Sequence, residues 1–471
     1  MLNTKIIATL GPASNSPECI RSLLGAEVNV FRLNASHGTW AEHFTSIQRV
    51  RQAADLMGVE AAILLDLQGP KIRLGRFERG GCMLEAGSSF SITVENVLGN
   101  EEHASTDYGD FAKDVKPQDY VLLADGRVRL QAVDSDGVSV RCRVIYGGPI
   151  SDRQGINLPG VKITAPALTE KDLIDLASGL EGGIDFVALS FVREAEDVKR
   201  LRTVLRDKAA TIPIITKIEK PEGWENLDAI LTESDGIMVA RGDLGVEIAP
   251  EKVPYVQKDI IERAREKGKV VITATQMLES MIDNSTPSRA EASDIANAVY
   301  DGTDAVMLSA ETSVGKYPTE AARMMARIVL AAGSNRRFRA YKDLQLGNCP
   351  TYPEIIAASA CEAARTAGVA AIGVFTASGA AARLISRLRP SVPIYAFTPS
   401  RAVARELLLS FGVHPVLGAT VDSTDQMLEL VERTLLERGW LKAGDGVVVV
   451  AGQPVAQPGT TNFLKLHRLD R

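Results

Sequence analysis

Short apolar runs recur through residues 5–310 and are bounded by Gly, Pro or Asn. The eight runs begin at Lys5, Val28, Ala61, Asp185, Pro213, Gly236, Lys269 and Ala305. They lack alternation between apolar and polar positions, which is typical of parallel strands buried on both faces. Helical spacing lies between them, as in residues 169–180, where apolar residues follow the helix period behind the capping residue Thr169. Alternating strands and helices predict a parallel α/β fold.

One interval between these runs is much longer than the others. Successive runs start 23 to 36 residues apart, except that 124 residues separate Ala61 from Asp185. The extra residues alternate in polarity and contain Asp-Gly pairs at 125–126 and 136–137, which favour tight hairpin turns. We therefore predict a small all-β domain, residues 71–165, inserted after the third strand.

The eight strand-helix units predict a (β/α)8 TIM barrel built from residues 1–70 and 166–338. Residues 339–471 repeat the alternation of helices and strands without the polar clusters of the barrel. We predict an open α/β domain for this region. Its expected helices are 354–367, 380–388, 401–409 and 424–438, and its strands begin near 371, 393, 413 and 446.

Composition narrows the class of protein. The chain has 471 residues, 45% hydrophobic and 24% charged, as globular proteins have. The net charge of −6, without a run of Lys or Arg, disfavours nucleic acid as a partner. Five scattered cysteines without a CxxC pair indicate a reducing compartment and no zinc site. Neither a span of about 20 apolar residues nor a signal peptide is found, so we expect a cytoplasmic protein with no membrane partner.

Polar residues follow six of the eight predicted barrel strands. They are Arg32, Asn34, Ser36 and His37; Asp66, Lys71 and Arg73; Lys217 and Glu219; Arg241, Gly242 and Asp243; Thr275; and Ser309 and Glu311. The carboxyl ends of barrel strands meet at one mouth, where reactive groups gather. For a single residue the alternative is a barrel cap or a surface ion pair. Barrel stability does not require six such groups together, so we expect a functional site.

The predicted mouth has the charges of a site for an anionic substrate. Lys217 and Glu219 are two residues apart on one strand and point to the same face, as a structural salt bridge or as part of a site. Glu219 and Asp243 provide two carboxylates suited to Mg²⁺. If Gly242 and Asp243 begin a helical turn, their free N–H groups suit a carboxylate.

The remaining positively charged side chains at the predicted mouth limit the kinds of reaction that the site could catalyse. Arg32 and Arg73 carry guanidinium groups that match phosphate oxygens, although a lone Arg is usually a surface residue. His37 either contacts a nucleotide phosphate or caps the following helix. Because no activated Ser or Cys and no Rossmann fingerprint is found, the residues favour phosphoryl transfer or the handling of an enolate.

Several segments together resemble the pyruvate kinase family over almost the whole chain. They include TKIIATLGPAS, NVFRLNASHG, LLDLQGPKIRLG, ITKIEKPEG, DGIMVARGDLGVEI, VITATQMLESM, SRAEASDIANAV and DGTDAVMLSAET. The resemblance implies transfer of the phosphoryl group of phosphoenolpyruvate to ADP in glycolysis, with Mg²⁺ or Mn²⁺. It also implies a catalytic barrel, an inserted lid, a C-terminal regulatory domain and a homotetramer.

The resemblance assigns roles residue by residue. The implied catalytic residues are Lys217, Arg32, Thr275, Ser309 and Glu311. Thr275, Ser309 and Glu311 resemble a relay that protonates the enolate through water. Arg32, Lys217, Gly242, Asp243 and Thr275 match substrate contacts, and Glu219 and Asp243 match the metal ligands. The positions that contact the nucleotide in the family are matched by Asn34, Ser36, His37, Arg73 and Arg153. Either Arg153 or Gln154 takes the place of a lysine of the family there.

Two departures from the family pattern lead to further expectations. Asn34, Ser36, Asp66 and Leu67 match a pocket for K⁺, but Lys71 stands where K⁺-requiring members have Glu. We expect the Lys71 ammonium to replace K⁺, unless its side chain points to solvent. The loop that binds effectors in the family is matched by Thr376, Ala377, Ser378, Gly379 and Ala380. In this chain the loop contains no basic side chain. We expect activation by a phosphorylated metabolite such as a sugar monophosphate or AMP.

Two other functions stay open at this stage. A metal-dependent pyruvate aldolase on a related barrel would share the metal-binding carboxylates, but it would not need Lys217, a lid or an ADP site. A catalytically inactive metabolite sensor would use the C-terminal domain, although none of the implied catalytic residues is missing. Retro-aldol activity without ATP formation would favour the aldolase.

Overall fold

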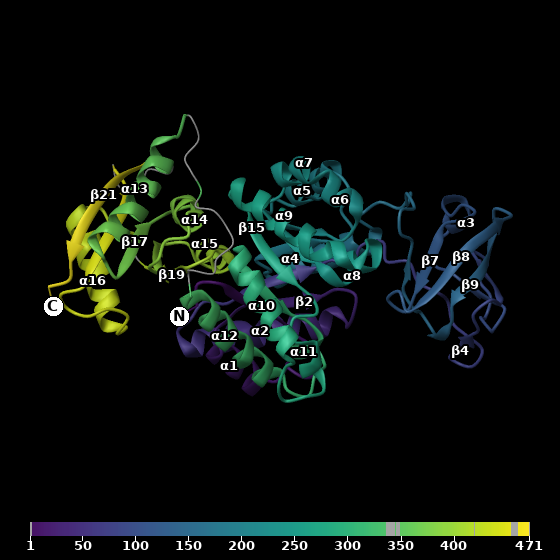
Figure 1. Cartoon of the computed structure of the whole chain (residues 1–471). Coiled ribbons are helices and arrows are strands. Elements are labelled where there is room, and N and C mark those ends of the chain that lie inside the picture. Colours follow the sequence, from purple (N-terminus) through teal and green to yellow (C-terminus); the bar gives the residue numbers. More distant parts are fainter. Residues whose placement is uncertain (1, 336–343, 345–348, 419, 454–459, 471) are drawn as a thin grey trace.

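Eight parallel strands close a barrel at the centre of the molecule (Figure 1). The computed structural model describes residues 2–335, 344, 349–418, 420–453 and 460–470. The barrel strands are β1 (Lys5–Thr9), β2 (Val28–Asn34), β3 (Ala62–Asp66), β12 (Phe186–Leu189), β13 (Ile214–Ile218), β14 (Gly236–Ala240), β15 (Val270–Ala274) and β16 (Ala305–Leu308). β1 closes the barrel by pairing with both β2 and β16. The predicted fold class is confirmed.

Helices surround the barrel and bury the outer faces of its strands. They are α1 (Pro17–Gly25), α2 (Trp40–Met57), α4 (Glu170–Gly182), α5 (Ala195–Asp207), α6 (Pro221–Glu225), α7 (Leu227–Glu233), α8 (Arg241–Glu247), α9 (Val253–Glu266), α10 (Arg289–Asp301), α11 (Ala310–Ser313) and α12 (Pro318–Ser334). Thr169 caps α4 in a capping box with Asp172, as its position predicted. Each strand is buried on both faces, because alternate residues pack inside the barrel or against the helices, as Ile7 and Ile6 do.

A second body of strands lies between β3 and β12. It holds a six-stranded sheet and a two-stranded sheet, and we call the whole body the inserted sheet (residues 81–157). It contains β4 (Gly81–Leu84), β5 (Ser89–Thr93), β6 (His103–Ser105), α3 (Phe111–Asp114), β7 (Tyr120–Leu123), β8 (Val128–Ser135), β9 (Ser139–Tyr146), β10 (Gly148–Ser151) and β11 (Ile156–Asn157). The Asp-Gly pairs join antiparallel strands, β7 to β8 and β8 to β9, as predicted. The short helix α3 departs from the all-β prediction. The inserted sheet has its own apolar core.

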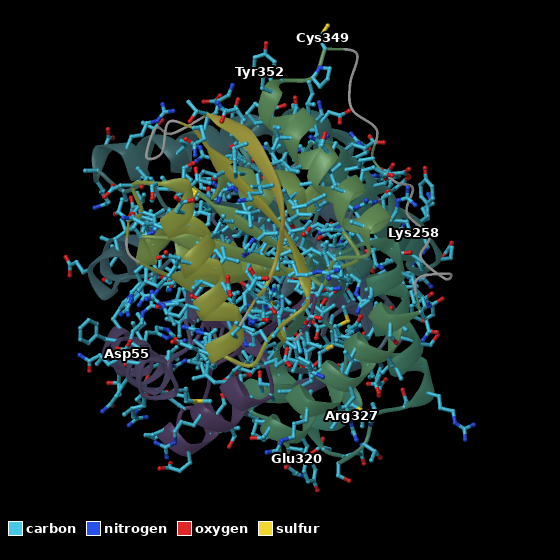
Figure 2. The ribbon with its side chains drawn as sticks, turned by 90° about the vertical axis from the view of Figure 1, so that its left-hand side faces the viewer. Asp55, Lys258, Glu320, Arg327, Cys349 and Tyr352 are labelled. Atoms are coloured by element: carbon cyan, nitrogen blue, oxygen red, sulfur yellow. The ribbon has the colours of Figure 1, made fainter. Side chains whose placement is uncertain are left out.

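The C-terminal region forms a five-stranded sheet in the order β19-β18-β17-β20-β21. Its elements are α13 (Tyr352–Ala367), β17 (Ala371–Phe375), α14 (Ala380–Arg387), β18 (Ile394–Thr398), α15 (Arg401–Glu406), β19 (Val413–Leu417), α16 (Thr424–Glu437), β20 (Gly446–Gly452) and β21 (Thr461–Arg468). The prediction missed β21, which pairs antiparallel with β20. Figure 2 views the molecule from this end.

The two smaller bodies lie at opposite ends of the barrel (Figure 1). The C-terminal sheet adjoins the end where barrel strands begin: Arg405 of α15 lies 3.2 Å from Glu60, just before β3, and Arg389 lies 2.6 Å from Asp304, just before β16. The inserted sheet faces the mouth where the strands end. No helix in the described part of the chain is long and apolar enough to cross a membrane.

Candidate active site

A buried lysine occupies the centre of the barrel mouth. The Lys217 Nζ atom lies 2.8 Å from Glu219 Oε1 and 3.2 Å from Asp66 Oδ1. It also donates a hydrogen bond of 2.8 Å to the Ser190 hydroxyl. Only 9% of Lys217 is exposed, and 1% of Glu219. The strand-end pattern placed Lys217 and Glu219 correctly, and the structure adds Asp66 and Ser190 as direct partners.

Asp66 joins two cations at this mouth. Arg32 Nε lies 2.7 Å from Asp66 Oδ2, and Arg32 Nη1 donates to the Thr9 hydroxyl at 3.1 Å. Burial alone would raise the pKa of Asp66, but Lys217 and Arg32 lower it below its ordinary value. Burial likewise opposes charge on Lys217, yet Asp66 and Glu219 outweigh burial and raise the pKa of Lys217. The ammonium group therefore stays charged and is held in one orientation.

Two carboxylates at the mouth fit a divalent cation. Glu219 accepts a hydrogen bond of 2.8 Å from the Phe191 N–H, and Asp243 lies in the first turn of α8. Burial raises the pKa of Glu219, and the Asp243 carboxylate raises it further against the opposing charge of Lys217. A cation between two such carboxylates would relieve this repulsion, and carboxylate oxygens suit Mg²⁺ or Mn²⁺. No cluster of three or more His, Cys, Asp or Glu suited to a metal lies within the described residues.

The loop after β15 is fixed by Arg241. Thr275 has a φ of +67°, and its hydroxyl accepts the Gly242 N–H at 2.7 Å and donates to the Ala274 carbonyl at 2.6 Å. The buried Arg241 side chain donates to the Thr275 carbonyl at 2.6 Å and pairs with Asp294 at 2.7 Å. Arg241 thus positions the loop from behind. α8 begins at Arg241, so Gly242 and Asp243 lie in a helical turn, but the Gly242 N–H is already used by the Thr275 hydroxyl.

Ser309 and Glu311 lie behind this loop. Glu311 accepts the Ser309 N–H at 2.6 Å and the Leu278 N–H at 3.0 Å. The Ser309 hydroxyl is buried and has no hydrogen-bond partner among the described residues. Thr275 makes no direct hydrogen bond to either side chain in that part of the chain. A proton relay through these residues would need water between them.

The side of the mouth near β2 is rich in cations. Arg73 Nη1 donates to the Arg153 carbonyl at 3.1 Å. Burial lowers the pKa of His37, and the charges of Arg73, Lys71 and Arg32 lower it further. Thr39, not His37, caps the following helix α2, which removes the capping alternative for His37. A neutral imidazole beside three cations matches an anion-binding surface.

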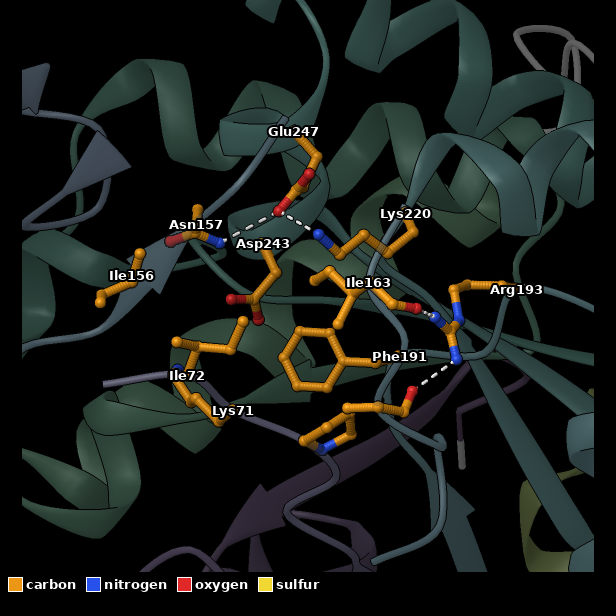
Figure 3. A pocket seen from close by; sticks show the side chains of 12 residues that line it. Lys71, Ile72, Ile156, Asn157, Ile163, Phe191, Arg193, Lys220, Asp243 and Glu247 are labelled. Carbon is orange, nitrogen blue, oxygen red and sulfur yellow. Dashed lines mark hydrogen bonds and ion pairs between the residues drawn. The ribbon is translucent and has the colours of Figure 1, made fainter. Parts of the chain in front are cut away.

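The residues matched to a K⁺ pocket lie at the ends of β2 and β3. Asn34 is the partner of Asp66 in the strand register, and the Asn34 side chain accepts the Ser36 N–H at 3.1 Å. The Leu67 carbonyl accepts the Ser190 hydroxyl at 2.7 Å. The half-buried Lys71 lines the pocket shown in Figure 3.

A pocket lies between the mouth and the inserted sheet (Figure 3). Barrel residues on its wall are Lys71, Phe191, Arg193, Lys220, Asp243 and Glu247, and Ile156 and Asn157 come from the inserted sheet. Arg193 donates a hydrogen bond of 2.7 Å to the Ala165 carbonyl, which holds the chain where it returns to the barrel. The inserted sheet is therefore attached beside Asp243.

The candidate effector loop lies between β17 and α14. The Thr376 N–H donates to the Phe397 carbonyl at 3.0 Å, and Gly379 has a φ of +80°. Arg383 of α14 donates to the Ser378 carbonyl at 2.6 Å. Residues 376–380 contain no basic side chain of their own. The guanidinium group of Arg383, in the following helix α14, lies against this loop instead. Arg383 lies outside the loop in sequence, so the composition of residues 376–380 does not reveal it.

Ser190 was also missed, although the same rule finds it. It directly follows β12, and it contacts both Lys217 and the Leu67 carbonyl. Thr9 ends β1 in the same way and contacts Arg32. Polar residues therefore follow all eight strands at this mouth.

Together, the fold and this site define a barrel enzyme whose mouth gathers cations and carboxylates around a buried lysine. Residues 1–322 match the family model described as pyruvate kinase, barrel domain, and residues 354–467 match that of pyruvate kinase, alpha/beta domain. The chain belongs to the pyruvate kinase family, a family of phosphotransferases. The predicted family and enzyme class are confirmed.

Relatives of known name match over nearly the full chain. A pyruvate kinase of Corynebacterium glutamicum is 46% identical, covering 99% of this chain and 97% of that protein. One of Mycobacterium tuberculosis is 45% identical, covering 99% and 98%. The crystal structure of a pyruvate kinase from Cryptosporidium parvum superposes with a TM-score of 0.92 at 37% identity, covering 99% of this chain and 96% of that chain.

Proposed function

We propose that this chain transfers the phosphoryl group of phosphoenolpyruvate to ADP, giving pyruvate and ATP in glycolysis, with Mg²⁺ or Mn²⁺. The observation that carries the proposal is Lys217, held between Asp66 and Glu219 at the barrel mouth with Asp243 nearby. Membership of the family further leads us to propose a homotetramer in the cytoplasm.

Phosphoryl transfer depends on positioning and on neutralising charge, rather than on a protein nucleophile. The Lys217 ammonium and the Arg32 guanidinium share Asp66 and stand ready where negative charge develops on the migrating group. Because both cations are already fixed, little reorganisation is needed as the transition state forms. Lys217 is placed to stabilise the enolate oxygen that remains after transfer.

Glu219 and Asp243 are the residues that would hold the divalent cation. When bound, that cation offsets the negative charge of the substrate and enolate oxygens. Gly242 directly precedes Asp243 in α8 and bonds the Thr275 hydroxyl, and Gly242 and Thr275 would orient the substrate carboxylate. Thr275, Ser309 and Glu311 would deliver a proton to the enolate carbon through water, which completes pyruvate.

The nucleotide would bind at the cationic side of the mouth. Asn34, Ser36 and His37 follow β2, and Arg73 and Arg153 meet across the first and last segments of the insertion. The inserted sheet stands over this side and would act as a lid. Closing it excludes water while the phosphoryl group moves and prevents its loss to hydrolysis.

A coupled assay tests the reaction directly. With phosphoenolpyruvate, ADP and Mg²⁺ present, lactate dehydrogenase converts the pyruvate formed and oxidises NADH. We expect NADH oxidation that depends on ADP and is matched by ATP formation. Retro-aldol activity without ATP would instead identify the aldolase alternative. No turnover under any of these conditions would support the inactive sensor.

We expect the activity not to depend on K⁺. Lys71 lines the pocket at the mouth, and its charge lies close enough to His37 to lower the pKa of that side chain. Replacing K⁺ by tetramethylammonium should change kcat less than twofold. The matched variant Lys71→Glu should need K⁺ for full activity. A large loss of turnover in the unchanged protein without K⁺ would contradict the proposal.

We expect a phosphorylated metabolite to activate the enzyme through the loop 376–380. Backbone N–H groups at the start of α14 and the Arg383 guanidinium suit a phosphate group. Sugar monophosphates and AMP should lower the half-saturating concentration of phosphoenolpyruvate, and Arg383→Met should remove this effect while the basal kcat is kept. The expectation is wrong if only fructose 1,6-bisphosphate activates, or if Arg383→Met responds like the parent.

A further inference from the structure

A second buried ion pair lies beside the mouth, outside every role assigned above. Lys220 Nζ lies 2.6 Å from Glu247 Oε1, and the Asn157 side-chain amide donates to the same oxygen at 3.3 Å. Only 5% of Lys220 and 7% of Glu247 is exposed. We call Asn157, Lys220 and Glu247 the polar joint; Figure 3 shows its two contacts as dashed lines.

The polar joint connects three segments that matter to the site. Lys220 directly follows Glu219 at the end of β13, and Glu247 is the last residue of α8, which carries Asp243 in its first turn. Asn157 ends β11 of the inserted sheet. One carboxylate oxygen therefore ties together the segments of both proposed metal ligands and the proposed lid.

The turn between β7 and β8 also lies near α8. A Cβ atom added to Gly126 of this turn would lie 3.7 Å from the Val246 side chain. β7 is the strand that pairs with β11. The Asn157 hydrogen bond and this turn thus place two parts of one sheet near the end of the helix that carries Asp243.

Glu247 holds the Lys220 ammonium in an ion pair. A buried ammonium without its partner seeks another anion; Asp243 lines the same pocket as Lys220, and Glu219 directly precedes Lys220 in the chain. The second oxygen of Glu247, Oε2, is buried and accepts no hydrogen bond from the described residues. The orientation of Glu247 therefore depends on Lys220 and Asn157 alone among them.

We propose that the polar joint is a set of positioning residues that keeps Glu219 and Asp243 free for the metal and couples them to the inserted sheet. The proposal rests on the proposed function, because it takes these two carboxylates as the metal site. None of the three residues of the joint touches the reacting atoms in this scheme. Their effect is on metal affinity and on closure of the lid.

The first test measures Mn²⁺ binding to the full chain from the electron paramagnetic resonance signal of free Mn²⁺. Glu247→Gln keeps the shape and an acceptor for Asn157 but leaves Lys220 without a counter-ion. We expect the Kd for Mn²⁺ to rise by about 10- to 100-fold, as for other groups that orient metal ligands. Lys220→Met with Glu247→Met leaves no unpaired charge, so the Kd should return to within about threefold of the parent.

The second test separates the lid from the ion pair. Asn157→Leu removes the bond from the inserted sheet and leaves Lys220 paired with Glu247. We expect the Kd for Mn²⁺ to stay within twofold, and kcat to fall about tenfold because the lid is misplaced. A purely structural role for Asn157 would lower the unfolding temperature and leave kcat unchanged.

Control variants separate the possible failures. Asp304→Asn leaves the buried Arg389 unpaired at the far end of the barrel, and should lower stability without changing the Kd for Mn²⁺. If Asp243→Asn binds Mn²⁺ as tightly as the parent, the proposed metal site itself is wrong. If Asp243→Asn loses Mn²⁺ but Glu247→Gln stays within twofold of the parent, only the polar joint is wrong. If Glu247→Gln does not fold, an unchanged kcat in Asn157→Leu overturns the proposal.

Discussion

Replacing Lys217 by methionine is expected to lower kcat by about 10³- to 10⁵-fold, the range found when a cation that stabilises phosphoryl transfer is removed. Methionine has a similar length and leaves Asp66 paired with Arg32. The loss therefore measures the missing charge rather than a collapsed site. The measurement is the coupled assay with saturating phosphoenolpyruvate, ADP and Mg²⁺.

The matched control for this variant is Lys258→Met. Lys258 also pairs with a carboxylate, that of Asp301, but its side chain is 52% exposed and lies on α9. Its removal should leave kcat within twofold, because exposed ion pairs contribute little. A folded Lys217→Met enzyme that keeps more than a tenth of the parent kcat would show that Lys217 is not the central cation.

Replacing Glu219 by glutamine is expected to raise the Mg²⁺ concentration for half-maximal activity at least about 100-fold. Changes to groups that only orient metal ligands already cost about 10- to 100-fold, and Glu219 is proposed as a ligand itself. Glutamine can still accept the Phe191 N–H bond, so the loop after β12 keeps its support. Activity measured across a series of Mg²⁺ concentrations gives this value.

Direct Mn²⁺ binding separates a lost metal site from a damaged active site. In Glu219→Gln, free Mn²⁺ should remain visible at concentrations that the parent protein binds completely. Asp259→Asn is a suitable control, because Asp259 is an acidic residue on α9 that bonds Trp224 and Arg263. An unchanged Mn²⁺ affinity in Glu219→Gln would place the metal elsewhere.

Most of the fold followed from local pattern. The barrel strands form continuous apolar runs because both of their faces are buried, and the Asp-Gly pairs mark hairpins because Gly126 and Gly137 have φ values of +84° and +88°. β21 was missed for the opposite reason. None of its residues TNFLKLHR is buried, because it lies at the edge of the sheet, so its sequence has no continuous apolar run. Only its pairing with β20 makes it a strand.

The sequence predicted those site residues that stand at the carboxyl ends of barrel strands. Lys217 and Glu219 are neighbours along one strand, so their proximity follows from strand geometry alone. The contacts of Asp66 with Arg32 and Lys217 could not be predicted in the same way, because these residues stand on three different strands. Arg241 shows the limit most clearly. It stands in the same run as Asp243, yet its side chain turns away from the mouth to Asp294.

The closure of the barrel by β1 sets an order on folding during synthesis. Lys5 pairs beside Ala305, so the ring of strands cannot close until nearly all of the barrel has left the ribosome. At about 5–20 residues per second, that wait lasts roughly 15 to 60 seconds. The inserted sheet is complete at Asn157 and has its own core, so it can fold within the nascent chain while β1 still lacks its partner β16 and β3 still lacks its partner β12. Those two edges are therefore the segments of the unfinished barrel most in need of protection by chaperones.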